Sequence, residues 1–380
     1  MSDLEVRQCT KTVMDTIADP NISFDENGVC NYYYEYFEKE KKHVKKGQEG
    51  IDFYNNKIAQ IKKDGQHKKY DCILGLSGGV DSSYLAFLAK KEGLHPLVVH
   101  FDNGWNSELA VKNIENIVSI LGFDLYTYVI NWEEFKDIQL AYLKASVIDI
   151  EAITDHAIIA TLYQLAAKHK INYFLSGFNI VTEAILPNAW IFKKQDAANI
   201  KSIHKTYGTV PLKTFPFLDA FKKRYYSLAL KIESVPLLNY IDYNKDHVKE
   251  ILKKELNWKD YGGKHYESVW TRFYQGYILP EKFKVDKRKA HLSTLICSGQ
   301  ITKEQALEEL KTPICDTEQL QIDKDFVLKK LGLTKTEFDN LMQLPPRPHT
   351  DFETEAASYF DKYPIFKPLK GVYNLIKPKK

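Results

Sequence analysis

The chain has 380 residues, of which 44% are hydrophobic and 27% charged, and its net charge is +3. This composition is typical of an ordinary soluble globular protein, and the length allows about two or three domains. No apolar run approaches the roughly 18 residues of a membrane span, and the polar residues 1–5 do not resemble a secretory signal. We therefore expect a cytoplasmic protein without a membrane partner. The small net charge also argues against a nucleic-acid partner.

The first part of the chain is expected to form a small lobe. Residues 1–35 contain turn signals and little periodicity, and residues 36–68 are charged and predicted to be helical. The five cysteines are odd in number and widely spread, which does not indicate a disulfide framework. We assign residues 1–65 to an N-terminal lobe with a lead-in helix.

From residue 70 to about 177, apolar strand-like runs alternate with helix-like stretches. The predicted strands and helices are 71–76, 81–92, 96–101, 107–121, 125–130, 133–147, 156–169 and 172–176. Such alternation implies right-handed crossovers and predicts the α/β class, with a doubly wound parallel sheet covered by helices on both faces. We assign this domain to residues 66–185.

The first predicted strand runs into the string Ser77-Gly78-Gly79-Val80-Asp81-Ser82-Ser83 and then into a helix. Glycines at such a turn let the backbone approach an anion, and the helix N-terminus favours phosphate. The string has neither the Walker ending nor the dinucleotide fingerprint. It resembles the pyrophosphate loop of enzymes that split ATP into AMP and pyrophosphate. That resemblance implies that all of its residues except Val80 bind ATP, with Asp81 holding magnesium; the alternative is a tight turn in an unrelated α/β domain.

Other predicted strands also end in residues that suit a nucleotide pocket, because ligands of parallel sheets bind beyond the carboxyl ends of the strands. Asp102 ends the second strand and is either an ATP contact or part of a plain turn. The segment 175–183 resembles one found in ammonia-using ATP pyrophosphatases such as NAD synthetase, which implies that Gly177 lies near the phosphates and that Glu183 holds magnesium. Asp155 opens a predicted helix, either as an N-cap or as a substrate or magnesium contact.

The region 186–380 is predicted to be mainly helical, with helices at 245–256, 302–311 and 324–343. Its segments 261–277 and 279–293 mix cations with aromatic residues. They form either an exposed helix pair or a site for an anionic, hydroxylated ligand, since Arg suits carboxylate and phosphate groups. The candidate substrate-binding residues are Lys264, His265, Glu267, Arg272, Lys287 and Arg288.

Taken together with the pyrophosphate loop and the strings 9–16 and 24–31, these segments carry a family resemblance. The chain is similar to the N-acetyl sugar amidotransferases of the WbpG or PseA type. These are synthetase components of surface-polysaccharide and nonulosonic-acid pathways. The resemblance implies that ATP and Mg²⁺ serve to adenylate an acetamido group of a nucleotide-activated sugar, which ammonia then converts to an acetamidino group. It implies catalytic roles for Asp81, Asp155 and Glu183, release of AMP and pyrophosphate, and an adenine nucleotide alpha hydrolase-like fold.

In one respect the sequence departs from this family. The family pattern has two Cys-x-x-Cys pairs that would form a four-thiolate zinc site. Here only Cys9 and Cys30 remain, because Thr12 and Tyr33 occupy the second position of each pair. Zinc is therefore not expected, and we predict no metal beyond magnesium.

The source of ammonia and the reaction class depend on further expectations. No cysteine has the sequence context of a glutaminase nucleophile, so ammonia should come from a separate HisH-like glutaminase with a HisF-like channel protein, as kinship suggests. The helical half could also form a homodimer surface. The alternative enzyme class is a sulfur transferase acting on tRNA or a small molecule, and the non-enzymatic alternative is a nucleotide binder. Exchange of pyrophosphate into ATP would separate an enzyme from a nucleotide binder. Dependence on ammonia would separate the amidotransferase from the sulfur transferase.

Overall fold

A five-stranded parallel sheet forms the centre of the computed structural model, which describes residues 6–263 and 266–355. The strand order is β3-β2-β1-β4-β5, and all neighbouring pairs are parallel. The strands are β1 (Cys72–Gly75), β2 (Pro96–Asp102), β3 (Leu125–Val129), β4 (Tyr173–Leu175) and β5 (Glu233–Val235).

Helices precede the sheet, connect its strands and build the second half of the chain. Up to β5 they are α1 (Asn31–His43), α2 (Gly47–Gly65), α3 (Val80–Lys91), α4 (Glu108–Leu121), α5 (Trp132–Ala145), α6 (Ala152–Lys168), α7 (Ile180–Glu183), α8 (Ala197–Tyr207) and α9 (Ala220–Leu228). After β5 follow α10 (Lys245–Leu256), α11 (Val269–Phe273), α12 (Leu279–Phe283), α13 (Arg288–Cys297), α14 (Lys303–Lys311), α15 (Thr317–Leu331) and α16 (Lys335–Gln343).

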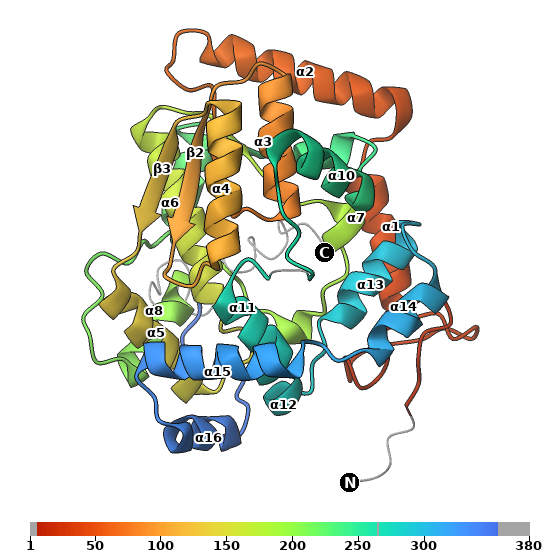
Figure 1. Ribbon diagram of the computed structural model, residues 1–380, viewed down its shortest axis with the longest axis vertical. Helices are drawn as coiled ribbons and strands as arrows, with labels where there is room; N and C mark the ends of the chain where they lie inside the picture. The colour runs from red at the N-terminus through yellow and green to blue at the C-terminus, as the bar shows by residue number, and fades with distance from the viewer. Residues whose placement is uncertain (1–5, 264–265, 356–380) are drawn as a thin grey trace, which may run out of the picture.

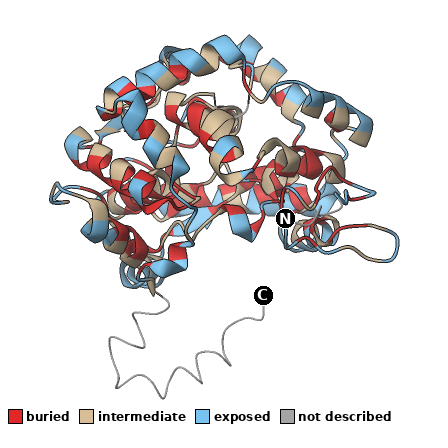
Figure 2. Cartoon of the chain, turned by 90° about the horizontal axis from the view of Figure 1, so that it is seen from below, coloured by how far each residue is buried: buried red, intermediate tan, exposed pale blue. Residues whose placement is uncertain are grey.

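Helices cover both faces of the sheet, as the alternating pattern predicted. Adjacent residues of β1 point to opposite faces, so Leu74 packs in the cluster with α3, α4 and α10, whereas Ile73 packs in the cluster with α6. In Figure 1, α3 and α4 lie in front of the sheet and α2 lies across its upper edge. Figure 2 shows buried residues on the inner sides of the helices and exposed ones outside.

The strands point toward the C-terminal helices, with α11 and α15 beyond the ends of β2 and β3 (Figure 1). A third hydrophobic cluster at this end joins Met14 of the N-terminal lobe, Trp105 after β2 and Trp270 of α11. The lobe, the sheet edge and the C-terminal helices therefore share one core, and the carboxyl ends of the strands are enclosed by residues from distant parts of the sequence.

The four predicted strands and the helices between them are confirmed to within a few residues, and α10 has the predicted bounds. Two predicted helices are wrong in extent. The stretch 36–68 contains the second part of α1 and the whole of α2, and extended backbone at Val44 and Lys46 separates the two helices. The stretch 324–343 contains the second half of α15 and the whole of α16, because Gly332 takes the left-handed conformation (φ 72°) and ends α15.

Strand β5 was not predicted, and it lies beyond the domain boundary proposed at residue 185. It has three residues, which is too short for a recognisable alternation, and it pairs with β4 only after α7, α8 and α9 have intervened. The division into 1–65, 66–185 and 186–380 remains a prediction, but the sheet itself draws on the third of these regions.

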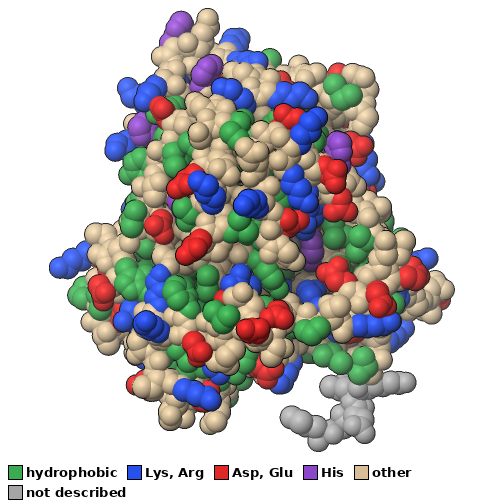
Figure 3. Space-filling view, viewed as in Figure 1, with side chains coloured by type: hydrophobic (Ala, Val, Ile, Leu, Met, Phe, Trp, Pro, Cys, Tyr) green, Lys and Arg blue, Asp and Glu red, His purple; other side chains and the backbone are tan. Residues whose placement is uncertain are grey.

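Across residues 6–263 and 266–355, no helix is both long and apolar enough for a membrane crossing. Figure 3 shows acidic and basic side chains interspersed over one face of the molecule, without a large field of one sign. This distribution agrees with the small net charge.

Candidate nucleotide-binding site

The strand order creates a switch point between β1 and β4. From β1 the chain moves to β2 on one side, and it later returns to β4 on the other side. Leu74 pairs with Leu175, so the segments that follow these two residues emerge side by side at the carboxyl edge. Crevices of this kind are the usual ligand sites of open α/β sheets. The segment after β1 is the predicted phosphate loop.

Gly78 has a conformation and a close neighbour that require glycine. Its φ is +83°, and a Cβ built there would lie 2.8 Å from the Tyr261 hydroxyl oxygen. The Gly78 carbonyl accepts hydrogen bonds from Trp258 Nε1 at 2.8 Å and from the Tyr261 hydroxyl at 2.9 Å. Two aromatic residues from the second half of the chain thus hold the loop in place.

We expect Gly78→Ala to lower both stability and nucleotide affinity, since alanine would be strained at this φ and would displace Tyr261. The expected loss of stability is about 1–3 kcal/mol. Thermal unfolding and calorimetric titration with a non-hydrolysable ATP analogue would measure the two effects. Gly262→Ala is the matched control for backbone strain, because Gly262 also has positive φ but its Cβ would meet nothing within 4 Å. Equal losses of affinity in both variants would contradict the assignment.

The serines of the loop divide into two kinds. Ser77 and Ser82 lie at the loop, with hydroxyl oxygens 3.1 Å apart, and Gly79 donates its N–H to Ser77 Oγ at 3.2 Å. Helix α3 begins directly after Gly79 without a side-chain cap, which leaves its N-terminal dipole directed at the loop. Ser83 is fully buried beneath the loop, and its hydroxyl has no hydrogen-bond partner. The geometry thus supports phosphate binding by Ser77 and Ser82 and gives no such support for Ser83.

Asp81 and Glu183 lie around one buried phenol. The Tyr243 hydroxyl donates a hydrogen bond to Asp81, and Asn179 Nδ2 donates another at 3.3 Å. Burial, together with the carboxylates of Asp81 and Glu183, raises the pKa of Tyr243 well above its ordinary value. Two carboxylates beside a phosphate loop are the hard oxygen donors that Mg²⁺ prefers, so these residues fit the predicted magnesium site.

The end of β4 and helix α13 complete this side of the site. A Cβ on Gly177 would lie 3.5 Å from the backbone nitrogen of Ser82, so the predicted residue Gly177 does lie against the loop. His291 Nδ1 is 3.1 Å from the Thr182 carbonyl oxygen, and His291 Nε2 is 3.4 Å from Lys245 Nζ. Sequence reasoning missed Tyr243 and Lys245, which carry no motif of their own and approach the loop only through folding.

At the end of β2, the turn that contains Asp102 is joined by a backbone hydrogen bond to the distant residue Glu267. Asp102 Oδ1 accepts the Gly104 N–H at 2.8 Å, and the Glu267 carbonyl accepts the Ser107 N–H at 2.9 Å. The Glu267 carboxylate oxygen lies 3.4 Å from the position of a Cβ on Gly79. Glu267, predicted to bind the sugar, thus lies directly beside the phosphate loop.

Asp155 lies in the first turn of α6 and pairs with Lys194 at 2.7 Å. Lys194 also contacts Asp149 at 3.3 Å, and the Asp149 side chain is 1% exposed. Burial raises the pKa of Asp149, whereas Asp155 and Asp149 raise that of Lys194. The structure thus places Asp155 in an ion-pair network, and its predicted catalytic role stays a prediction.

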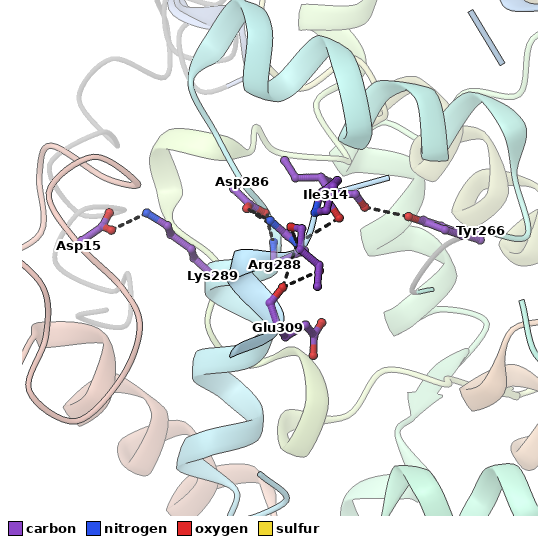
Figure 4. Close-up of polar contacts among 9 residues, drawn as sticks. Asp15, Tyr266, Asp286, Arg288, Lys289, Glu309 and Ile314 are labelled. Atoms are coloured by element: carbon purple, nitrogen blue, oxygen red, sulfur yellow. Dashed lines mark hydrogen bonds and ion pairs between the residues drawn. The ribbon is translucent and has the colours of Figure 1, made fainter. Parts of the chain in front are cut away.

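Two arginines predicted to bind substrate are instead engaged inside the protein. Arg272 forms a bidentate pair with buried Asp323, at 2.6 and 2.7 Å. Figure 4 shows Arg288 turned toward Asp286 and toward the chain that follows α14; Asp286 is 2.8 Å away, and the guanidinium also donates to the Thr312 carbonyl at 2.9 Å. Their guanidinium groups stabilise the fold, so the geometry does not support the assignment of these two arginines to sugar binding.

The remaining predicted cations have different positions. Lys287 Nζ lies 3.6 Å from the Glu151 carboxylate, and both side chains are mostly buried. Lys264 and His265 lie outside the described residues. The predicted sugar site is therefore only partly covered by the described residues, because two of its six candidate residues lie outside them.

The Cys9 and Cys30 pair does not fit a four-thiolate zinc site. Cys9 Sγ accepts the Cys30 N–H at 3.2 Å, and Thr12 Oγ1 lies 3.6 Å from Cys30 Sγ. Hydrogen bonding from the Cys30 thiol lowers the pKa of Cys9. The Tyr33 ring packs against Phe37. Among the described residues, no three His, Cys, Asp or Glu side chains are arranged to hold a metal ion. The lobe is instead joined to α13 through the Asp15–Lys289 ion pair, also visible in Figure 4.

The sheet order and the phosphate loop define an adenine nucleotide alpha hydrolase-like domain, and residues 71–178 match the family model described as asparagine synthase. Residues 267–367 match the model described as LPS biosynthesis protein WbpG-like, C-terminal domain. The chain thus joins an asparagine synthase-type nucleotide domain to a WbpG-like C-terminal domain, as the sequence resemblance implied.

Curated relatives match parts of the chain. The tRNA(Ile)-lysidine synthase of Chlamydia pneumoniae is 38% identical over 72 residues, which cover 18% of this chain and 22% of that protein. The 7-cyano-7-deazaguanine synthase of Methanospirillum hungatei is 28% identical over 148 residues, which cover 39% of this chain and 63% of that protein. The chain therefore spans less than two thirds of the length of each.

Solved structures that match the chain include an NH3-dependent NAD synthetase from Campylobacter jejuni and an NMN synthetase from Francisella tularensis. The first is 14% identical, with 75% of this chain and 97% of that chain covered and a TM-score of 0.30. The second is 14% identical, with 74% and 96% covered and a TM-score of 0.31. At these scores the fold assignment rests on the sheet topology and the domain matches.

Proposed function

We propose that this chain is an ATP-dependent amidotransferase that converts an acetamido group of a nucleotide-activated sugar into an acetamidino group. The observation that carries the proposal is the direct contact between the two domains at one site. Gly79 of the phosphate loop lies against Glu267, the first residue of the WbpG-like match. A nucleotide bound at the loop would thus lie next to the domain whose family is associated with lipopolysaccharide biosynthesis.

The proposed chemistry explains why ATP is needed. An amide carbonyl is a poor electrophile and its oxygen is a poor leaving group. Transfer of AMP to that oxygen, with loss of pyrophosphate, creates a good leaving group, and ammonia then displaces AMP at the same carbon. Ser77, Ser82 and the backbone around Gly79 would hold the departing pyrophosphate, since preorganised donors stabilise developing charge.

Asp81 and Glu183 would hold magnesium in this reaction, and the metal would neutralise charge on the phosphate oxygens. Tyr243 and Asn179 orient the Asp81 carboxylate by donating hydrogen bonds to it. The buried environment that raises the pKa of Tyr243 keeps its phenol protonated at neutral pH, so it serves as a donor.

Ammonia is proposed to come from a separate HisH-like glutaminase through a HisF-like channel protein, and a homodimer is proposed as a further assembly. The state of Cys72 argues against sulfur transfer at the loop. Cys72, the cysteine nearest the loop in sequence, is fully buried, and burial raises the pKa of its thiol well above the ordinary value. A thiol in that state is a poor nucleophile.

The test measures AMP release from ATP with ammonium chloride and a panel of nucleotide-linked diacetamido sugars, together with product mass. A product about one mass unit lighter than its substrate, formed with stoichiometric AMP, is the expected result, because NH replaces O. Incorporation of sulfur would instead establish thiolation. Nucleotide binding without cleavage, under all conditions and with folded protein, would favour a non-catalytic binder.

A further inference from the structure

Lys330 of α15 lies at the turn that ends β2, although more than two hundred residues separate them in sequence. Its ammonium group donates a hydrogen bond to the Gly104 carbonyl. Gly104 has positive φ (+79°), and a Cβ there would lie 3.1 Å from Lys330 Nζ. The side chain thus fits a space that a residue larger than glycine would close.

Three aromatic rings surround the same ammonium group. Lys330 Nζ lies 4.9 Å from the centre of the Trp105 ring, 4.8 Å from that of Trp132 and 5.5 Å from that of Phe326. Cation–π attraction holds a charge in such a setting. Phe326 and Lys330 come from the same helix, whereas both tryptophans belong to the nucleotide domain. The contact therefore joins the C-terminal region to the end of β2.

From Gly104 a continuous chain of hydrogen bonds leads to the phosphate loop. Gly104 N–H donates to Asp102 Oδ1 at 2.8 Å, and the same oxygen accepts from Asn106 Nδ2 at 3.3 Å. Asn106 Nδ2 also lies 3.2 Å from His100 Nε2, and His100 Nδ1 lies 3.2 Å from the Leu76 carbonyl oxygen. The next residue along the chain is Ser77.

The directions of these bonds agree with a single state of the imidazole. A carbonyl only accepts, so His100 Nδ1 carries the proton, and Nε2 then accepts from the Asn106 amide. Burial lowers the pKa of His100, which keeps the ring neutral. Asp102 and Lys330 are the charged groups at the end of this hydrogen-bond series that lies away from the loop. Each polar group in the series therefore has a donor or acceptor of the correct kind.

We propose that Lys330 is a positioning residue for nucleotide binding: through Gly104, Asp102, Asn106 and His100 it holds the phosphate loop in the form that receives ATP. The ATP part of this inference rests on the proposed function, but the effect on the loop does not. The WbpG-like domain would then contribute to nucleotide affinity from outside the nucleotide domain, since Lys330 lies within the segment that matches it.

The test compares Lys330→Met with Lys329→Met on the same helix, because Lys329 is exposed. Hydrogen exchange of the loop amides (76–83) in the nucleotide-free protein and calorimetric affinity for a non-hydrolysable ATP analogue are the two readouts. We expect Lys330→Met to raise the exchange rate of the loop amides about tenfold and to lower the affinity for the ATP analogue about tenfold. A factor of this size corresponds to the loss of one charge-assisted hydrogen bond. Lys329→Met should change neither, and Lys330→Arg should recover part of both.

Asn106→Ala supplies a second, independent variant, since it removes the link between Asp102 and His100. In the double variant with Lys330→Met, the fold-change in each readout should be smaller than the product of the two single fold-changes, because both substitutions interrupt the same series of hydrogen bonds. Unchanged loop exchange in Lys330→Met, or effects that multiply fully in the double variant, would overturn the inference. If loop exchange responds as expected but the wild-type chain does not bind the ATP analogue, the proposed function fails while the positioning role stands.

Discussion

Asp81→Asn is expected to lower the rate of AMP formation at least about 100-fold while leaving the fold intact. The carboxylate lies beside the phosphate loop and is oriented by Tyr243 and Asn179. Asparagine keeps the size of the side chain and an oxygen that can accept these hydrogen bonds, but it removes the charge that would hold magnesium. Losses of 10²–10³-fold are the usual order when one group that stabilises transition-state charge is removed.

Steady-state AMP release and the magnesium concentration for half-maximal rate would measure this effect, with circular dichroism as the check on folding. Asp52→Asn is a suitable control, because Asp52 is exposed on α2 at the opposite edge of the sheet. Tyr243→Phe should give a smaller loss, since the carboxylate remains and only one donor is removed. Wild-type turnover in Asp81→Asn would exclude Asp81 as a magnesium ligand.

Arg272→Ala is expected to destabilise the protein by about 3–5 kcal/mol, because it leaves the buried Asp323 carboxylate without its partner. The Asp323 side chain is 2% exposed and that of Arg272 is 13% exposed. Arg347→Ala provides a matched comparison, since the Arg347–Asp351 pair has side chains that are 40% and 38% exposed. Exposed pairs contribute about 0–1 kcal/mol. Denaturant unfolding of both variants would measure the difference.

The double variant Arg272→Met with Asp323→Leu should recover much of the lost stability, because replacing both members of a buried pair by apolar residues is often neutral. ATP affinity should change little in Arg272→Ala at temperatures where the protein is folded. If Arg272→Ala were as stable as the wild-type protein and lost only sugar binding, Arg272 would return to the sugar site that the sequence predicted.

Local patterns explain why much of the nucleotide domain was predictable. The strand–glycine–helix string fixes Ser77 and Asp81 relative to each other within a few residues, so their proximity needs no tertiary information. The placement of Gly177 against Ser82 also followed, because two parallel strands end at the same edge of a sheet. Residue type was a poorer guide for cations. Arg272 and Arg288 have the chemistry of anion binding, but the acidic residues that neutralise them determine whether that chemistry is free.

The sequence by itself determined the α/β class, the strand–glycine–helix loop and the kinship of the C-terminal region, because each depends on residues close together along the chain. Only the tertiary structure decided which distant residues hold that loop. Trp258 and Tyr261 bind Gly78, Tyr243 binds Asp81, and Lys330 reaches the end of β2. None of these contacts has a local pattern, since each arises when the second half of the chain packs across the carboxyl edge of the sheet.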